Sequence, residues 1–394
     1  MKIHTLRLLF VVALIFSLLA PSANAHAATF SVFNLDDNGP GSLRQAIVAA
    51  NATAGADTIT FSISGTIKLV TMLPLITDAA ELTIDGSGQA VTISGEHLVR
   101  VMRVESGASL TLDHLTIANG TSPATDAGGG IYNKNGNVTI SNSTFSGNTA
   151  DVFGGGLYNE GGTVIITNST FSGNSAIQGG GVFNDSGTLT VTNSTFSLNM
   201  GDDGGGIAIY CTSTTNSTTI IANVTFSGNS ATNAGGGILV FGYAGNSVTV
   251  LNSTLSGNSS ANSPWPFGGG IRINSGTVTF RNTIIANNTS GGNCSGVPIN
   301  GGNNLDSGTT CGWGSASASI SNTDPLLEAL TGSPAYFLLH GGSPAIDAGN
   351  DAVCASAPLN NTSQNGIVRP QGFHCDSGSY EQIMYMHHLP LIMH

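Results

Sequence analysis

The sequence predicts an all-β fold in which the chain winds into a solenoid of stacked coils. A run of three glycines followed by an aliphatic residue recurs at intervals of 25 to 33 residues, starting at Gly128, Gly154, Gly179, Gly204, Gly235 and Gly268. The segments that follow alternate β-branched and hydroxyl side chains, as in VTISN, VIITN and VTVLN, which is typical of strands. Repetition at this period indicates coils that pair in parallel, about 4.8 Å apart.

The same glycines exclude a loop that cradles phosphate. Such a loop occurs once per nucleotide site and opens a helix. Here the glycines occur six times and precede strands. Their recurrence suits a sharp bend and a close approach of neighbouring backbones.

Two columns of asparagine accompany the glycines. The first column is Asn142, Asn168, Asn193, Asn223, Asn252 and Asn282. The second, six residues later in each coil, is Asn148, Asn174, Asn199, Asn229, Asn258 and Asn288. We expect ladders at the corners of the coil, where each amide bonds its copy in the next coil and asparagine tolerates a left-handed backbone.

The core is predicted from the apolar columns between these asparagines. Midway between the two asparagines of each of the first four coils lies a phenylalanine: Phe145, Phe171, Phe196 and Phe226. The alternation on the preceding strands adds Val138, Val164 and Leu189 in one column and Ile140, Ile166 and Val191 in another. We expect these side chains to point inward and to stack from coil to coil.

The ends of the stack need covers, because an open coil exposes its interior and its strand edges. Residues 1–27 are predicted to be a secretory signal peptide, with a short apolar run, Leu8–Ala20, behind Lys2 and Arg7. Residues 28–58 are predicted to form an N-terminal cap with a short helix, in which Ser42 is the N-cap. The coils are expected to occupy residues 59–290.

Five cysteines in an exported chain indicate disulfides. Cys294 and Cys311 form one local pair beyond the last repeat, and Cys354 and Cys375 form a second. Cys211 alternates with Ile207 and Ile209, so we interpret it as a small buried residue.

Composition narrows the range of partners. The formal net charge is -12, and only 8% of the residues are charged. Because the ten basic residues are scattered, the chain lacks the basic stripe that nucleic acid or an anionic membrane requires. After Ala20 no apolar run is long enough to cross a membrane.

These motifs together resemble a known family. GGGIYN…VTISNSTFSGN is similar to the polymorphic-outer-membrane-protein-type repeats of right-handed parallel β-helix proteins. NTDPLLEAL, GGSPAIDAGN, VRPQG and CDSGSYE resemble a choice-of-anchor Q domain over residues 291–381, followed by a tail at 382–394. The resemblance implies a pectate-lyase-like solenoid on a secreted, cell-surface or outer-envelope protein. It implies no catalytic constellation, and SQNGIVRPQG lacks the acidic and basic residues often found before the Arg-Pro of such domains.

We therefore expect a non-catalytic, adhesin-like or envelope scaffold. The alternative is an extracellular enzyme, a lyase or hydrolase that degrades polysaccharide, for which the candidates are Asp202, Asp203 and Arg272. None of the acids in the six coils is expected to recur at one column on adjacent coils. Facing carboxylates on neighbouring coils in a structure would favour the enzyme.

Outward aromatic side chains offer a second candidate site. Tyr132, Tyr158 and Phe183 occupy one column, which predicts either a platform for stacking sugars of an extracellular polysaccharide or a ladder that only stabilises the sheet. The acidic segment Leu35–Gly39 could take Ca²⁺ or be a plain turn. We expect no other metal and no cofactor.

Overall fold

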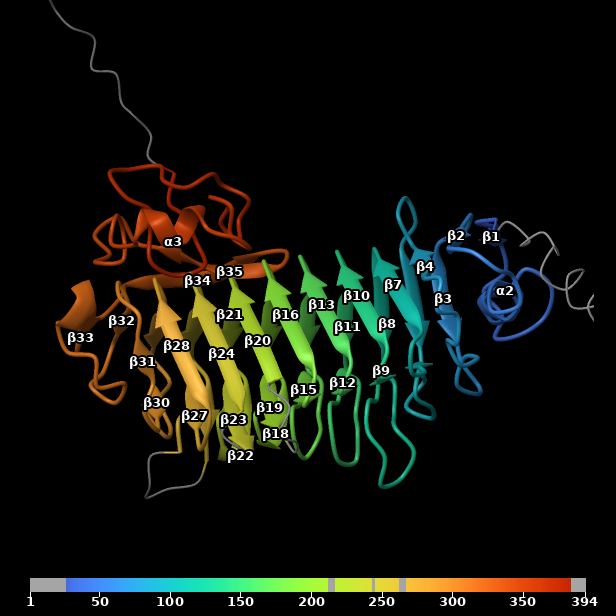
Figure 1. Cartoon of the computed structure of the whole chain (residues 1–394), viewed down its shortest axis with the longest axis horizontal. Helices are drawn as coiled ribbons and strands as arrows, with labels where there is room; N and C mark the ends of the chain where they lie inside the picture. The colour runs from blue at the N-terminus through green and yellow to red at the C-terminus, as the bar shows by residue number, and fades with distance from the viewer. Residues whose placement is uncertain (1–25, 212–216, 243–244, 262–266, 384–394) are drawn as a thin grey trace, which may run out of the picture.

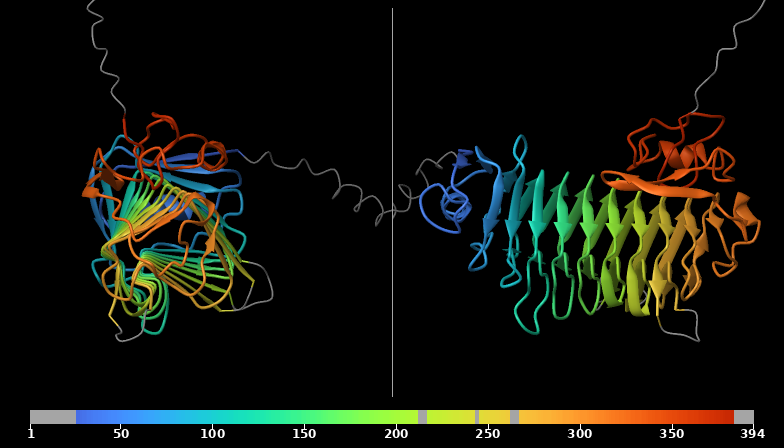
Figure 2. Two further views of the ribbon diagram at one scale, coloured as in Figure 1. Left: turned by 90° about the vertical axis from the view of Figure 1, so that its left-hand side faces the viewer. Right: turned by 180° about the vertical axis from the view of Figure 1, so that it is seen from behind.

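The computed structural model describes residues 26–211, 217–242, 245–261 and 267–383. In this part the chain forms a right-handed parallel β-helix built on three long parallel sheets (Figures 1 and 2). Each central coil contributes one strand to each sheet, the coils at the ends contribute to fewer, and each strand pairs with the same strand of the next coil. No helix within these ranges is long and apolar enough to cross a bilayer. The predicted signal peptide falls almost entirely outside the described residues.

The three sheets are named A, B and C in chain order. Sheet A contains β1 (Thr29–Val32), β2 (Asp57–Phe61), β4 (Leu82–Asp85), β7 (Ser109–Asp113), β10 (Asn137–Ser141), β13 (Thr163–Thr167), β16 (Thr188–Thr192), β20 (Ser217–Ala222), β24 (Asn246–Leu251), β28 (Thr277–Arg281) and β31 (Ile299–Asn300). Sheet B contains β3 (Gly65–Lys68), β5 (Val91–Ser94), β8 (Leu115–Ala118), β11 (Thr144–Ser146), β14 (Thr170–Ser172), β17 (Thr195–Ser197), β21 (Thr225–Ser227), β25 (Thr254–Ser256), β29 (Ile284–Ala286), β32 (Leu305–Asp306) and β33 (Ile320–Ser321). Sheet C contains β6 (Met102–Val104), β9 (Ile131–Lys134), β12 (Leu157–Glu160), β15 (Val182–Asp185), β19 (Ile207–Cys211), β23 (Ile238–Gly242), β27 (Ile271–Ile273) and β30 (Cys294–Ser295). A small sheet D adds β18 (Met200–Asp203), β22 (Ser230–Ala234) and β26 (Ser259–Ser260).

The first asparagine column forms the corner between sheets A and B. Its six members have φ between 41° and 54°, in the left-handed region that asparagine adopts more readily than most residues. The left-handed corner is confirmed, and amide bonds between copies join Asn168 to Asn142, Asn223 to Asn193 and Asn282 to Asn252. In the second column the left-handed residue is instead the one before the asparagine, such as Gly147, Gly173 or Gly228.

The second asparagine column is the buried ladder that was predicted. Asn174 Nδ2 donates to Asn199 Oδ1 (2.9 Å) and to the carbonyl of Phe145 (3.0 Å). Its Oδ1 accepts from both nitrogens of Asn148, at 2.9 and 3.0 Å. Every member from Asn148 to Asn288 is buried, so the ladder carries backbone and side-chain bonds through an interior without water.

Apolar side chains fill the space between the sheets, as the columns predicted. The rings of Phe145, Phe171, Phe196 and Phe226 stack with centroids 4.6 to 5.2 Å apart and nearly parallel planes. A third asparagine ladder, Asn133, Asn159 and Asn184, was not foreseen, and its amides join at 2.7 Å.

The N-terminal cap is the short helix α2 (Leu43–Ala50), which closes one end of the stack (Figure 1). Ser42 is its N-cap and accepts a hydrogen bond from Gln45 N (3.3 Å). The face formed by Leu43, Ala46, Ile47 and Ala50 is buried against the core. The solenoid begins before this helix, because β1 already pairs in parallel with β2.

At the other end the coils continue past residue 290, where we expected them to stop. Strands β30 to β33 extend all three sheets as far as Ser321. The disulfide Cys294–Cys311 lies in this last part of the solenoid, and Trp313 packs on Phe280 at 5.6 Å. The short 3-10 helix η1 (Ala316–Ala318) precedes the last strand. The C-terminal module therefore begins about 30 residues later than predicted.

That module, residues 322–383, folds back over the corner between sheets A and B. It contains the antiparallel hairpin of β34 (Leu327–Gly332) and β35 (Ala335–Leu339) and the short helix α3 (Asp351–Ala355). Figure 1 shows it above the light-green, yellow and orange coils, with the blue and teal coils left uncovered. The second predicted disulfide, Cys354–Cys375, joins α3 to the last loop of the module.

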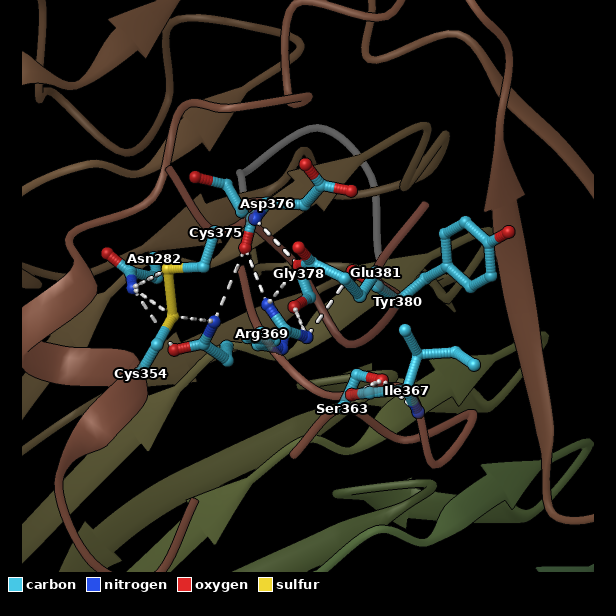
Figure 3. Close-up of polar contacts among 12 residues, drawn as sticks. Asn282, Cys354, Ser363, Ile367, Arg369, Cys375, Asp376, Gly378, Tyr380 and Glu381 are labelled. Atoms are coloured by element: carbon cyan, nitrogen blue, oxygen red, sulfur yellow. Dashed lines mark hydrogen bonds and ion pairs between the residues drawn. A yellow bond between two sulfur atoms is a disulfide. The ribbon is translucent and has the colours of Figure 1, made fainter. Parts of the chain in front are cut away.

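A buried arginine organises the module. The Arg369 guanidinium donates to the carbonyls of Asp376 (2.6 Å), Gly378 (2.9 Å) and Tyr380 (3.3 Å), and lies 3.5 Å from Glu381 (Figure 3). Both Glu381 oxygens accept backbone N–H groups, from Gln371 and Asp376. The VRPQG and CDSGSYE motifs are thereby explained as one polar core that fixes the shape of the loops.

Replacing Asn174 by alanine should destabilise the solenoid strongly. The change leaves the N–H groups of Asn148 and the carbonyl of Phe145 buried without a partner, at a cost of about 3 to 5 kcal/mol in the free energy of unfolding. Chemical denaturation followed by circular dichroism measures this loss. Asn137→Ala, at an exposed position of β10, is the control and should change stability by less than about 0.5 kcal/mol. Equal effects of the two substitutions would contradict the ladder.

Arg369→Met should release the module while leaving the coils folded. Removing the cation leaves the Glu381 carboxylate and three carbonyls buried without their partner, a loss of about 3 to 5 kcal/mol. Limited proteolysis should then cut within residues 322–383 and spare residues 60–320. A variant that resists protease as well as the wild type does would show that the arginine network is not needed.

Candidate functional site

One coil departs from the rule of the left-handed corner. By backbone pairing, the corner column runs from Gly86 through His114 to Asn142 and on along the asparagines. His114 has φ of 53° at this position. Histidine, like asparagine, adopts the left-handed backbone more readily than most residues, so the corner keeps its path while the side chain adds an imidazole.

The residue before the corner departs from the pattern as well. Asp85, at the end of β4, lies directly opposite Asp113, at the end of β7, where later coils have Ser141 and Thr167. Like charges opposite each other on neighbouring strands are destabilising. One oxygen from each carboxylate and one nitrogen of His114 all lie within 4.8 Å of one another.

Hydrogen bonds keep Asp113 ionised. Its Oδ1 accepts from Ser141 Oγ (2.7 Å) and Asn142 Nδ2 (2.8 Å), and its Oδ2 accepts from His114 Nδ1 (2.9 Å). Burial raises the pKa of Asp113, but these three donors outweigh burial and hold the pKa below its usual value. The bond at Nδ1 fixes the His114 ring and leaves Nε2 for a ligand.

His114 lines a groove on the outer face of sheet B, whereas Asp85 and Asp113 lie at the ends of sheet A strands and are not part of its lining. Its first section, of about 220 Å³, is lined by Gln89, Ala90, Val91, Thr92, His114, Leu115, Thr116, Asn142 and Thr144. A second section, of about 380 Å³, shares Asn142 and Thr144 and continues over Asn168 and Thr170 to Ser333, Pro334 and the segment 364–366. The shared residues make the two sections one groove along the solenoid axis.

The floor of the groove is a column of threonines. Thr92, Thr116, Thr144, Thr170, Thr195, Thr225 and Thr254 occupy matching positions on successive strands of sheet B. The first four are partly exposed, whereas the last three are buried beneath the C-terminal module. Hydroxyl groups at regular spacing can bond a ligand that repeats along the same axis.

The acid and base candidates that the sequence offered for an enzyme, Asp202, Asp203 and Arg272, are not brought together. Asp202 and Asp203 lie on β18, where they accept from Thr232 (2.6 Å) and Asn233 (2.8 Å). Arg272 lies on β27, two coils further along, or roughly 10 Å along the axis. Arg272 bonds Ser295 and Asn274 and packs on Phe267. This separation argues against a shared catalytic role.

The aromatic column is a ladder, which corrects the suggestion of a sugar platform. Phe153 folds over it and stacks on Phe183 at 4.6 Å. Tyr158 is 7% exposed and Phe183 is 1% exposed, so neither offers a free ring face. Arg103 lies over the Tyr132 ring at 4.9 Å. The column belongs to a second apolar cluster outside sheet C.

The expectation that no acid in the coils recurs at one column was also wrong. Glu160 and Asp185 lie opposite each other on β12 and β15. The hydroxyl of Tyr132 bonds Glu160, and that of Tyr158 lies 3.5 Å from Asp185 Oδ2. This pair is part of the aromatic ladder and lies on a different sheet from the groove.

The segment Leu35–Gly39 forms a turn in which Asp37 pairs with Arg44 at 2.6 Å. Among the described residues, only Asp85, Asp113 and His114 lie close enough together to offer a metal ion three such ligands. Two carboxylates and an imidazole suit a transition metal better than Ca²⁺, which prefers a cage of oxygens.

The sequence did not predict the His114 site, because the triple glycine that marks the repeat first occurs at Gly128, after these residues. The earlier coils lack that marker. Their strands nevertheless carry the same pattern, since LTIDG at 82–86 and LTLDH at 110–114 align with VTISN at 138–142. Aligning these segments would have placed both aspartates in one column.

Comparison with known proteins agrees with this architecture. The model of the family described as "Right handed beta helix region" matches residues 90–220. A solved structure of the major allergen from cedar pollen is 15% identical in sequence, with a TM-score of 0.40, over 87% of this chain and 89% of that one. The structure of pectate lyase Pel9A is 16% identical, with a TM-score of 0.43, over 90% of this chain and 96% of that one. Curated proteins give no match to the sequence.

The prediction of a non-catalytic chain needs correction. The solved structures reported above include a pectate lyase. That likeness concerns the fold. The structure itself supplies facing carboxylates on neighbouring coils, the observation expected to distinguish an enzyme from a scaffold.

His114→Asn should leave the protein as stable as the wild type. Asparagine is the residue of the other coils at this corner, and the free energy of unfolding should change by less than about 0.5 kcal/mol. His114→Val should lose about 1 to 2 kcal/mol, because a β-branched residue resists the left-handed backbone. Chemical denaturation measures both. A loss above about 1 kcal/mol for His114→Asn would assign the histidine a structural role.

Proposed function

We propose that this protein is an extracellular glycoside hydrolase that cleaves a polysaccharide bound along the groove of sheet B. The observation that carries the proposal is the pairing of Asp85 with Asp113 next to His114, the member of the cluster that lines the groove. Two carboxylates close together are the machinery of glycoside hydrolysis.

The separation of the carboxylates favours a retaining mechanism. One oxygen of each carboxylate lies within 4.8 Å of the other, which is short of the roughly 6.5 to 9.5 Å between the carboxyl groups of inverting enzymes. Asp113, held ionised by its three donors, attacks the anomeric carbon of the sugar. Asp85 delivers a proton to the departing glycosidic oxygen and then takes one from the water that releases the product.

His114 acts as a positioning residue in this scheme. Its Nδ1 orients the Asp113 carboxylate, and Nε2 can bond a sugar hydroxyl at the reacting ring. The imidazole therefore fixes the carboxylate and the substrate relative to each other. This positioning is what brings the attacking oxygen of Asp113 close to the anomeric carbon.

Charge and lining favour an uncharged substrate. The net charge of -12 and the two aspartates would repel a polymer of acidic sugars. From Asn142 to Gly366 the second section of the groove is lined only by uncharged side chains and backbone. The two disulfides support a location outside the cell, where such bonds persist.

Asp113→Asn and Asp85→Asn should each lower the rate of hydrolysis by about 10²-fold to 10⁴-fold. The test incubates the purified protein with xylan, galactomannan, mixed-linkage glucan and pectate, and scores new reducing ends. Nuclear magnetic resonance of the first product should show the anomeric configuration retained.

Asp185→Asn is the matched control, because Asp185 also faces a carboxylate on a neighbouring strand but lies on sheet C. It should leave the rate unchanged. Cleavage that survives both Asp85→Asn and Asp113→Asn would overturn the assignment. Products carrying a new carbon-carbon double bond would identify a lyase in place of a hydrolase.

A further inference from the structure

The groove is open at one end and closed at the other. Past Thr92 the outer face of sheet B continues to Thr66, which is exposed, with no module above it in Figure 1. In the opposite direction the groove stops at Ser333, Pro334 and the segment 364–366 of the C-terminal module. A polymer lying in the groove thus meets a wall made by a distant part of its own chain.

The wall is bonded to the same threonine column that forms the floor. Gln364 Nε2 donates to Thr195 Oγ1 (3.0 Å) and to the carbonyl of Ser194 (3.1 Å). Gln364 Oε1 accepts from Thr225 Oγ1 at 2.6 Å. The side chain of Thr195 also donates to the carbonyl of Ala335 at 2.5 Å. Because these groups are buried, the module is seated on the sheet and does not merely overhang it.

These contacts also indicate what the open part of the floor can hold. On the covered strands each threonine hydroxyl is satisfied by an uncharged amide, hydroxyl or carbonyl group. Thr116, Thr144 and Thr170 present the same hydroxyl in the same register and stay partly exposed. A sugar chain with hydroxyl or amide substituents supplies matching groups at that surface.

We infer that the site takes one end of an uncharged polysaccharide chain and releases a short oligosaccharide of fixed length. The inference rests on the proposed hydrolysis at Asp85 and Asp113 for the cutting step. The end of the chain would abut the module, and the rest would leave across Thr92 and Thr66. From the strand that follows His114, β8, to the first covered strand, β17, is three coils, or roughly 14 Å. Because the fold sets that distance, it also sets the length of the oligosaccharide product.

The experiment compares products and viscosity during hydrolysis by the full-length chain. Mass spectrometry of early time points should show one short oligosaccharide, while the viscosity of the polymer stays near its starting value. Thr170→Trp places a bulky ring at the last open position of the floor and should shorten that product. Thr190→Trp, an outward threonine on β16 of sheet A, is the matched control and should leave the product unchanged.

A binding measurement with a catalytically inactive variant tests the closed groove independently of catalysis. The Asp113→Asn variant is mixed with xylan, galactomannan or mixed-linkage glucan, each as a long fraction and as a sonicated fraction of equal mass. The amount of polymer that the variant binds should rise with the number of chain ends. Adding Thr170→Trp should weaken the affinity for the polymer by about tenfold, as for one lost subsite.

The outcomes separate the two proposals. Binding that follows chain ends without cleavage by the wild type would uphold the closed groove and overturn the hydrolase. Early products of many sizes with a rapid fall in viscosity would overturn the closed groove and uphold the hydrolase. Neither binding nor cleavage of any of these polymers would overturn both.

Discussion

The constraint on which this structure depends is that every coil must repeat the backbone of its neighbour. Parallel strands in register satisfy the N–H and C=O groups of one coil with those of the next, so a change of path in one coil breaks bonds in two others. The corner between sheets A and B fixes that path, because a left-handed residue must stand there in each coil. Asparagine meets the requirement with little strain from Asn142 to Asn282, and His114 adopts the same left-handed backbone one coil earlier.

The constraint also made most of the fold predictable. Residues at one column of the repeat occupy equivalent positions in the fold. The stacking of the phenylalanines and the corner position of the asparagines could therefore be predicted from their spacing in the sequence. The helix of the N-terminal cap followed from Ser42 and one apolar face. The two disulfides followed from the positions of the cysteines in pairs. In each case a local pattern and the global fold require the same residue.

Other parts could not be predicted, for physical reasons that differ. The last coil, up to Ser321, has only Gly291 and Gly292 where the earlier coils have three glycines, and the Cys294–Cys311 disulfide and Trp313 help to hold it. The burial of Tyr158 and Phe183 depends on Phe153, which reaches them from a loop between strands. The seating of the module on Thr195 and Thr225 joins residues about 140 positions or more apart. No periodicity in the sequence reports a contact between the repeat and a segment that does not repeat.

The candidate site illustrates how a regular solenoid can gain chemistry at a low structural cost. Asp85, Asp113 and His114 occupy column positions at the surface, so their substitution leaves the core and its ladders in place. The neighbouring coil supplies Ser141 and Asn142, ordinary members of their columns, as donors to Asp113. The repeat therefore provides both the spacing of the two carboxylates and the bonds that hold one of them ionised. The repeat cannot provide an end to the groove, because each added coil would lengthen the groove. The non-repeating module supplies that end, which gives a structural reason for a segment anchored by a buried arginine to sit on the face of the solenoid and not at its tip.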